Sequence, residues 1–117
     1  MTLNDYQKQA MTTNAESSDN DTYSLFGLIA EVGELADKVA KGVRKGYLYI
    51  DGNDIYLRGN IADFSEGMKK ELGDVLWFVA HFAKRFGWTL EEVAQLNLRK
   101  LEDRQKRGVI IGEGDNR

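Results

Sequence analysis

The stretch LIAEVGELADKV, residues 28–39, decides much of the fold because its apolar side chains recur at helical spacing. At about 100° per residue, these side chains form one narrow stripe along a helix. The stripe consists of Leu28, Val32, Leu35 and Val39. Glu31 and Glu34 lie one turn apart and close against it. The pattern predicts a bundle helix with two acids bordering its packing face.

A second stretch, KKELGDVLWF at 69–78, repeats this arrangement. Glu71 and Asp74 are three residues apart and therefore lie on one helical face. Glu71 borders an apolar stripe, as Glu31 does on the earlier helix. If the two stripes pack together in an antiparallel bundle, the carboxylates of both helices meet at the seam.

Converging carboxylates repel one another and raise one another's pKa, so they require a counter-charge. No lysine or arginine lies within either motif, and a hard divalent cation bound through oxygen is the natural partner. A single E-x-x-E is more typical of a solvated helix face, and that interpretation stays open for each pair alone. Di-iron bundles use Glu-x-x-His motifs. His81 has no acid at that spacing, which argues against a redox centre.

Composition narrows the class of protein. A chain of 117 residues fits one domain, and its net charge of −3 argues against a nucleic-acid surface. The absence of cysteine excludes disulfides and thiolate metal sites and fits a reducing cytoplasm. No signal pattern or membrane-length apolar run is present. We expect a soluble cytoplasmic protein, without a membrane or nucleic-acid partner, that gains stability as a homodimer or homotetramer.

Helix and turn signals divide the chain into elements of an all-α helical bundle with a small β-hairpin-like insertion between the second and third helices. The runs YLYI and IYLR flank the turn-prone DGND, and the TLEE sequence at 89–92 is a capping box. The expected elements are a short helix at 2–11, a long helix from Asp21 or Thr22 to about Lys45, the insertion at about 47–60, and a helix from about Ser65 to Phe86. A fourth helix opens with the TLEE capping box and runs to about Arg107, and a flexible tail follows at about 108–117.

The motifs EVGELAD and KELGDVLWFVA together resemble those of the MazG-like nucleoside triphosphate pyrophosphohydrolases, in the all-α superfamily that includes dimeric dUTPases and dCTP pyrophosphatases. The family pattern is E-E-x-x-E followed by E-x-x-D, and Ala30 stands where many members have the first glutamate. TLNDYQKQA, NLRKLEDRQKRG and GEGDNR extend the likeness over nearly the whole chain, apart from the hairpin. The resemblance implies a single MazG-like domain over 1–117.

The resemblance further implies hydrolysis of a nucleoside triphosphate to the monophosphate and pyrophosphate. Mg²⁺, with Mn²⁺ as a substitute, would be held by Glu31, Glu34, Glu71 and Asp74. Clustered Mg²⁺ ions suit this chemistry because they neutralise phosphate charge and activate water. Either Glu31 or Glu34 would be the general base. Such an enzyme would control the nucleotide pool or remove unwanted nucleotides.

Basic and amide side chains are candidates to bind the phosphates. Asn97, Lys100 and Arg104 follow at i, i+3 and i+7 and form one ridge of the fourth helix. Asn97 falls within an apolar face, so its amide needs either a structural hydrogen bond or a ligand. Lys100 and Arg104 alone suggest a solvated face, and the family likeness makes them candidates for the triphosphate tail. Lys41, beyond the glutamate pair, is a weaker candidate of the same kind.

The main alternative to an enzyme is a non-catalytic helical interaction module or regulatory subunit whose acids form a structural cation site. Metal-dependent release of pyrophosphate from nucleoside triphosphates separates the two hypotheses.

Overall fold

The computed structural model describes residues 1–58 and 62–117, and most of them are helical. The elements are α1 (Leu3–Met11), the short 3-10 helix η1 (Glu16–Ser18), α2 (Asp21–Arg44), β1 (Leu48–Asp51), β2 (Asp54–Leu57), α3 (Ala62–Arg85) and α4 (Leu90–Lys106). The predicted helical class, with a hairpin between the second and third helices, is confirmed. The end of the predicted insertion, residues 59–60, lies outside the described residues.

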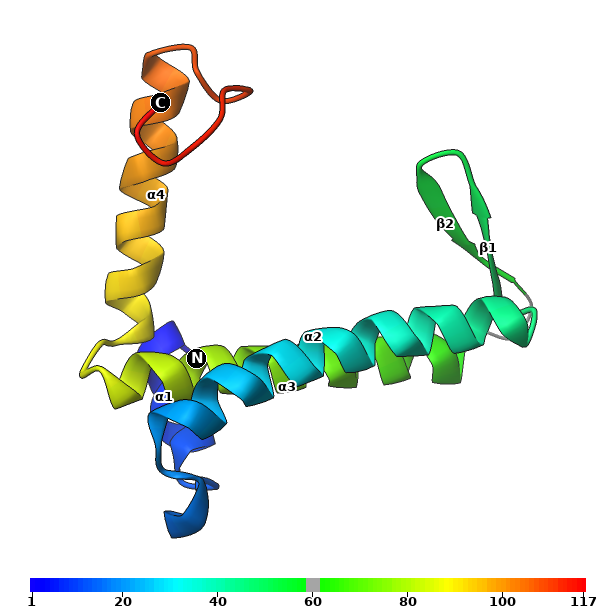
Figure 1. The fold of residues 1–117 in the computed structure, drawn as a ribbon, viewed down its shortest axis with the longest axis horizontal. Coiled ribbons are helices and arrows are strands. Elements are labelled where there is room, and N and C mark those ends of the chain that lie inside the picture. The colour runs from blue at the N-terminus through cyan, green and yellow to red at the C-terminus, as the bar shows by residue number, and fades with distance from the viewer. Residues whose placement is uncertain (59–61) are drawn as a thin grey trace.

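The long helices α2 and α3 run side by side, with the hairpin at one end of the pair and α1 at the other (Figure 1). α4 turns away from one end of this pair, and the hairpin projects to the same side at the other end (Figure 1). The chain therefore has two arms, and only the α2–α3 arm carries the acidic motifs.

Side-chain caps set where the helices begin. The Asn20 side chain accepts a hydrogen bond from the Tyr23 amide at the start of α2. At the start of α4, the Thr89 hydroxyl accepts from the Glu92 amide, and the Glu92 carboxylate accepts from the Thr89 amide. The capping box predicted from TLEE is thus confirmed. These local bonds satisfy amides that have no partner within the helix.

The hairpin pairs β1 with β2 in antiparallel register, with Leu48 opposite Leu57 and Asp51 opposite Asp54. Gly52, the first residue of the two-residue turn, has a φ of 60°, a conformation that glycine adopts at low cost. Leu48 is buried at the base of the hairpin, with 2% of its surface exposed. This leucine attaches the hairpin to the helical pair.

Glycines allow α2 and α3 to approach closely at both ends of the pair. A methyl group at Gly27 would collide with the ring of Phe78, and one at Gly42 would collide with the ring of Phe64. The aromatic rings of α3 therefore pack directly on the α2 backbone. This close packing brings the middle parts of the two helices together.

Gln7 of α1 fixes the corner between α3 and α4. Its amide nitrogen donates to the carbonyls of Ala80 (3.2 Å) and Trp88 (3.1 Å), and its amide oxygen accepts from the Leu90 amide (3.0 Å). The main buried cluster surrounds this corner and comprises Met11, Ala80, Ala83 and Leu90. The direction of α4 therefore depends on a side chain more than 80 residues earlier.

A buried polar network joins the start of α2 to α3. His81 Nε2 is 3.0 Å from the Asn14 amide oxygen, and His81 Nδ1 contacts the Ser24 hydroxyl. The amide oxygen only accepts, so Nε2 carries the proton and Nδ1 accepts from Ser24. Burial is the main cause that lowers the pKa of His81. Both ring nitrogens have protein partners, so the ring is a structural part of this network.

Large apolar side chains remain exposed on both arms of the chain. Phe26 and Leu96 are each 64% exposed, and Val32 of the predicted stripe is 51% exposed. The stripe thus faces α3 only in part, whereas Leu28, Leu35 and Val39 are half-buried. Within residues 1–58 and 62–117, no helix is both long enough and apolar enough to cross a membrane.

Candidate metal centre and nucleotide site

Three of the four predicted acids meet where α2 and α3 lie side by side. Glu31, Glu71 and Asp74 each offer an oxygen, and these oxygens all lie within 4.8 Å of one another. Glu34 is one turn further along α2 and is not part of this group. The structure therefore brings both sequence motifs to one place, with Glu34 at its border.

The electrostatics of this group favour a cation. The pKa of Glu31 is raised by burial first, and then by the charges of Asp74, Glu71 and Glu34. Among the described residues, none of these four acids takes part in an ion pair. A half-buried carboxylate beside other carboxylates, with no basic partner, fits a hard divalent cation bound through oxygen. The residues present thus suit Mg²⁺ or Mn²⁺.

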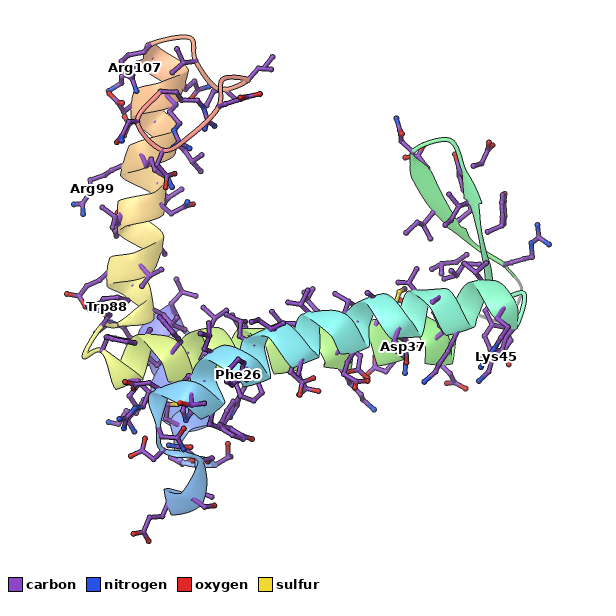
Figure 2. All side chains as sticks on the ribbon, viewed as in Figure 1. Phe26, Asp37, Lys45, Trp88, Arg99 and Arg107 are labelled. Atoms are coloured by element: carbon purple, nitrogen blue, oxygen red, sulfur yellow. The ribbon has the colours of Figure 1, made fainter. Side chains whose placement is uncertain are left out.

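A cavity of about 320 Å³ adjoins the acids on the side of the hairpin. Glu34 and Glu71 line it, so it borders both helices of the acidic group. Its other lining residues are Asp37, Lys38, Lys41, Gly42, Lys45, Tyr47, Asp63 and Phe64. Figure 2 shows Asp37 and Lys45 on the half of α2 nearest the hairpin. Lysines of α2 extend from the acidic group towards the hairpin, and Asp37 and Asp63 add two further carboxylates to the lining. The lysines make this cavity a candidate to bind a metal-bound polyanion.

Lys41 lies in this cavity but has an acidic partner. Its ammonium group is 2.7 Å from the Asp37 carboxylate, and this bond is the main cause that raises the pKa of Lys41. Lys38 and Lys45 are further candidates that the sequence analysis missed. Counted from Glu34, the three lysines follow at i+4, i+7 and i+11, which places them on one face of α2. That spacing is the signal that could have identified them.

The predicted basic ridge of α4 does not reach the acids of its own chain. Lys100 and Arg104 both bind the Asp115 carboxylate, at 3.2 and 3.1 Å, and their hydrogen bonds lower the pKa of Asp115. The buried Arg104 also donates to the Gly114 carbonyl. Asn97 is exposed, because α4 has left the helical pair. Within one chain, the ridge thus holds the C-terminal segment rather than the candidate metal centre.

Comparison with known proteins defines the class. Residues 21–109 match the MazG nucleotide pyrophosphohydrolase domain. This match covers α2, the hairpin, α3 and α4, and the chain therefore belongs to the MazG family. A curated relative, the Gene 37 protein of Mycobacterium phage L5, is 39% identical over 104 residues, which cover 89% of this chain and 82% of that protein. No solved structure matches the chain significantly.

Proposed function

We propose that this protein hydrolyses nucleoside triphosphates to the monophosphate and pyrophosphate, with Mg²⁺ as cofactor and Mn²⁺ as a substitute. The observation that carries the proposal is the meeting of Glu31, Glu71 and Asp74 from two helices, in a chain of the MazG family. In the cytoplasm, such an enzyme would control the nucleotide pool or remove unwanted nucleotides.

Glu31, Glu71 and Asp74 would hold the metal, with Glu34 completing the set at its border. When bound, Mg²⁺ would neutralise phosphate charge and acidify the attacking water. Glu34 is the better candidate for the general base, because it lies outside the three-carboxylate group and lines the cavity. A carboxylate that is not fully engaged by metal keeps an oxygen available for a proton. Glu31 is the other candidate.

The exposed apolar side chains support assembly into a homodimer or homotetramer. α2, α3 and α4 each expose large apolar residues, among them Phe26, Leu72 and Leu96. A second copy that covered them would remove this surface from water. In such an assembly, the exposed Asn97 would be available to the substrate of a neighbouring subunit, and Lys100 and Arg104 would reach that substrate by releasing Asp115. These contacts form part of the proposal.

The test is release of pyrophosphate from a panel of canonical and modified nucleoside triphosphates, with and without Mg²⁺. We expect turnover that requires Mg²⁺ and is lost in Asp74→Asn, while helical content is retained. Glu66→Gln, on the same helix and outside the acidic group, is the matched control and should remain active. Mg²⁺ binding without turnover of any substrate would instead support a structural cation site in a non-catalytic module.

A further inference from the structure

The two ends of the cavity beside the hairpin are lined by different kinds of side chain, and this difference bears on the direction in which a substrate would bind. Its end nearest the acidic group is marked by Glu34 and Glu71, and its far end by Tyr47 and Phe64. The Tyr47 and Phe64 rings lie 6.1 Å apart between centroids. Phe64 also packs on Gly42, which lines the cavity and at which α3 approaches the α2 backbone closely. The far wall is therefore built by the base of the hairpin and the first turn of α3.

Lys38, Lys41 and Lys45 line the same cavity. With a rise of about 1.5 Å per residue, Lys38 lies about 6 Å beyond Glu34 along the helix axis and Lys45 about 16 Å beyond it. The three lysines are thus spaced along the cavity from the acidic group towards the hairpin. Asp37, which pairs with Lys41, and Asp63 also line this part of the cavity. A metal-bound polyphosphate is the chemical group that matches metal-binding acids with lysines beyond them that are unpaired within the described part of the chain.

The side chain of Lys38 lies against α3. It is half-buried and lies across Gly67 of that helix, where a methyl group would collide with the end of the lysine side chain. Among the described residues, neither Lys38 nor Lys45 takes part in an ion pair. Both ammonium groups are consequently available to an anion, unlike Lys41, which already binds Asp37.

The charge balance explains why this anion would need metal at the acidic end. Four carboxylates line the cavity, those of Glu34, Asp37, Asp63 and Glu71, against three lysines. A divalent cation held by Glu31, Glu71 and Asp74 would offset the charge of Glu71, so that three lysines face the three carboxylates that remain. Without the cation the cavity carries more negative than positive side chains, and binding of an anion should therefore depend on Mg²⁺.

We propose that this cavity binds the departing pyrophosphate, so that the triphosphate tail points towards the hairpin and the nucleoside lies on the opposite side of the acids. The inference rests on the proposed hydrolysis. When water attacks the α-phosphorus, its oxygen forms a bond to that phosphorus and Glu34 takes its proton. The bond from the α-phosphorus to the bridging oxygen breaks, and its electron pair goes to pyrophosphate. Lys38 and Lys45 would stabilise that developing charge. The hairpin, through Tyr47, closes the pyrophosphate end of the site.

The test is calorimetric titration of inorganic pyrophosphate, and separately of a nucleoside monophosphate, into the full chain with excess Mg²⁺. We expect Lys38→Met and Lys45→Met each to weaken pyrophosphate binding by about tenfold or more, as expected for the loss of one charged hydrogen bond. Monophosphate binding should remain unchanged. Methionine keeps the apolar stem of lysine, so the fold is retained. Lys84→Met, on α3 and outside this cavity, is the control and should bind pyrophosphate like the wild type.

Lys45→Arg should bind pyrophosphate nearly as well as the wild type, because it keeps the charge. Unchanged pyrophosphate binding in both methionine variants would overturn the proposal, as would a wild type that binds no pyrophosphate. Weakened monophosphate binding with intact pyrophosphate binding would overturn it too, because the nucleoside would then lie at the hairpin. These titrations need no turnover, so their result is independent of whether the proposed hydrolysis fails.

Discussion

The Glu31→Gln variant should be more stable than the wild type without metal and less stable than the wild type when Mg²⁺ is present. Glu31 offers an oxygen within 4.8 Å of oxygens from Glu71 and Asp74. At that separation, two unit charges repel by about 0.9 kcal/mol in water and about 3.5 kcal/mol at an effective dielectric constant of about 20. Asp74 is exposed and Glu71 half-buried, so the lower part of this range applies.

We therefore expect the metal-free variant to gain about 1 kcal/mol, a rise of about 4 °C in Tm. Mg²⁺ should reverse the order, because it stabilises the wild type by about 2.7 kcal/mol at a concentration 100 times its Kd. The variant lacks one metal ligand, so Mg²⁺ should stabilise it much less than the wild type. Thermal unfolding followed by circular dichroism, in EDTA and in millimolar Mg²⁺ at matched ionic strength and protein concentration, measures both effects.

Glu66→Gln is the matched control, since Glu66 is an exposed acid of α3 outside the three-carboxylate group. Its response to Mg²⁺ should equal that of the wild type. The reasoning is refuted if Glu31→Gln melts earlier than the wild type in EDTA, or if Mg²⁺ stabilises both proteins equally. The first result would mean that Glu31 is not destabilised by its acidic neighbours, and the second would mean that Glu31 does not help to hold the cation.

Two further predictions concern stability. Burial lowers the pKa of His81, so the unfolded chain takes up the imidazole proton at a higher pH than the folded chain does. The free energy of unfolding should therefore fall as pH drops below about 6.5 and level off below the folded-state pKa. Urea midpoints across this range should show the loss of stability, and His81→Gln should make the midpoint less dependent on pH. Gly42→Ala should cost about 1–3 kcal/mol, because the added methyl group collides with the Phe64 ring. Gly33→Ala, where nothing lies within 4 Å of the added carbon, should instead gain up to about 1 kcal/mol. Equal effects of the two glycine substitutions would contradict the close helix packing.

The elements were predictable because their signals are local. The cap at Thr89 and the turn at Gly52 each depend on a few neighbouring residues, and the structure places both as expected. The convergence of the two acidic motifs was also accessible, since helical spacing places each pair on the edge of an apolar stripe. Their roles as ligands and base are still predictions.

The direction of α4 was not predictable from periodicity. It depends on the hydrogen bonds of Gln7 to backbone atoms far along the sequence. Because α4 turns away, the face that carries Asn97 is exposed, and the argument that its amide needs a buried partner does not hold within one chain. Periodicity shows that Val32 and Leu98 belong to apolar faces, but it does not show whether the same chain covers them. The spacing of the lysines from Glu34 could have been found in the sequence, but the cavity that they line requires the hairpin and α3 beside α2.

Hydrolysis of a nucleoside triphosphate in ¹⁸O-labelled water, with Mg²⁺ present, tests the central claim most directly. If the acids of α2 and α3 serve attack at the α-phosphorus, the label appears in the nucleoside monophosphate, and pyrophosphate leaves unlabelled and intact. Mass spectrometry of both products measures this. Label in pyrophosphate, free orthophosphate with a diphosphate intermediate, or no Mg²⁺-dependent turnover of any triphosphate would contradict the account.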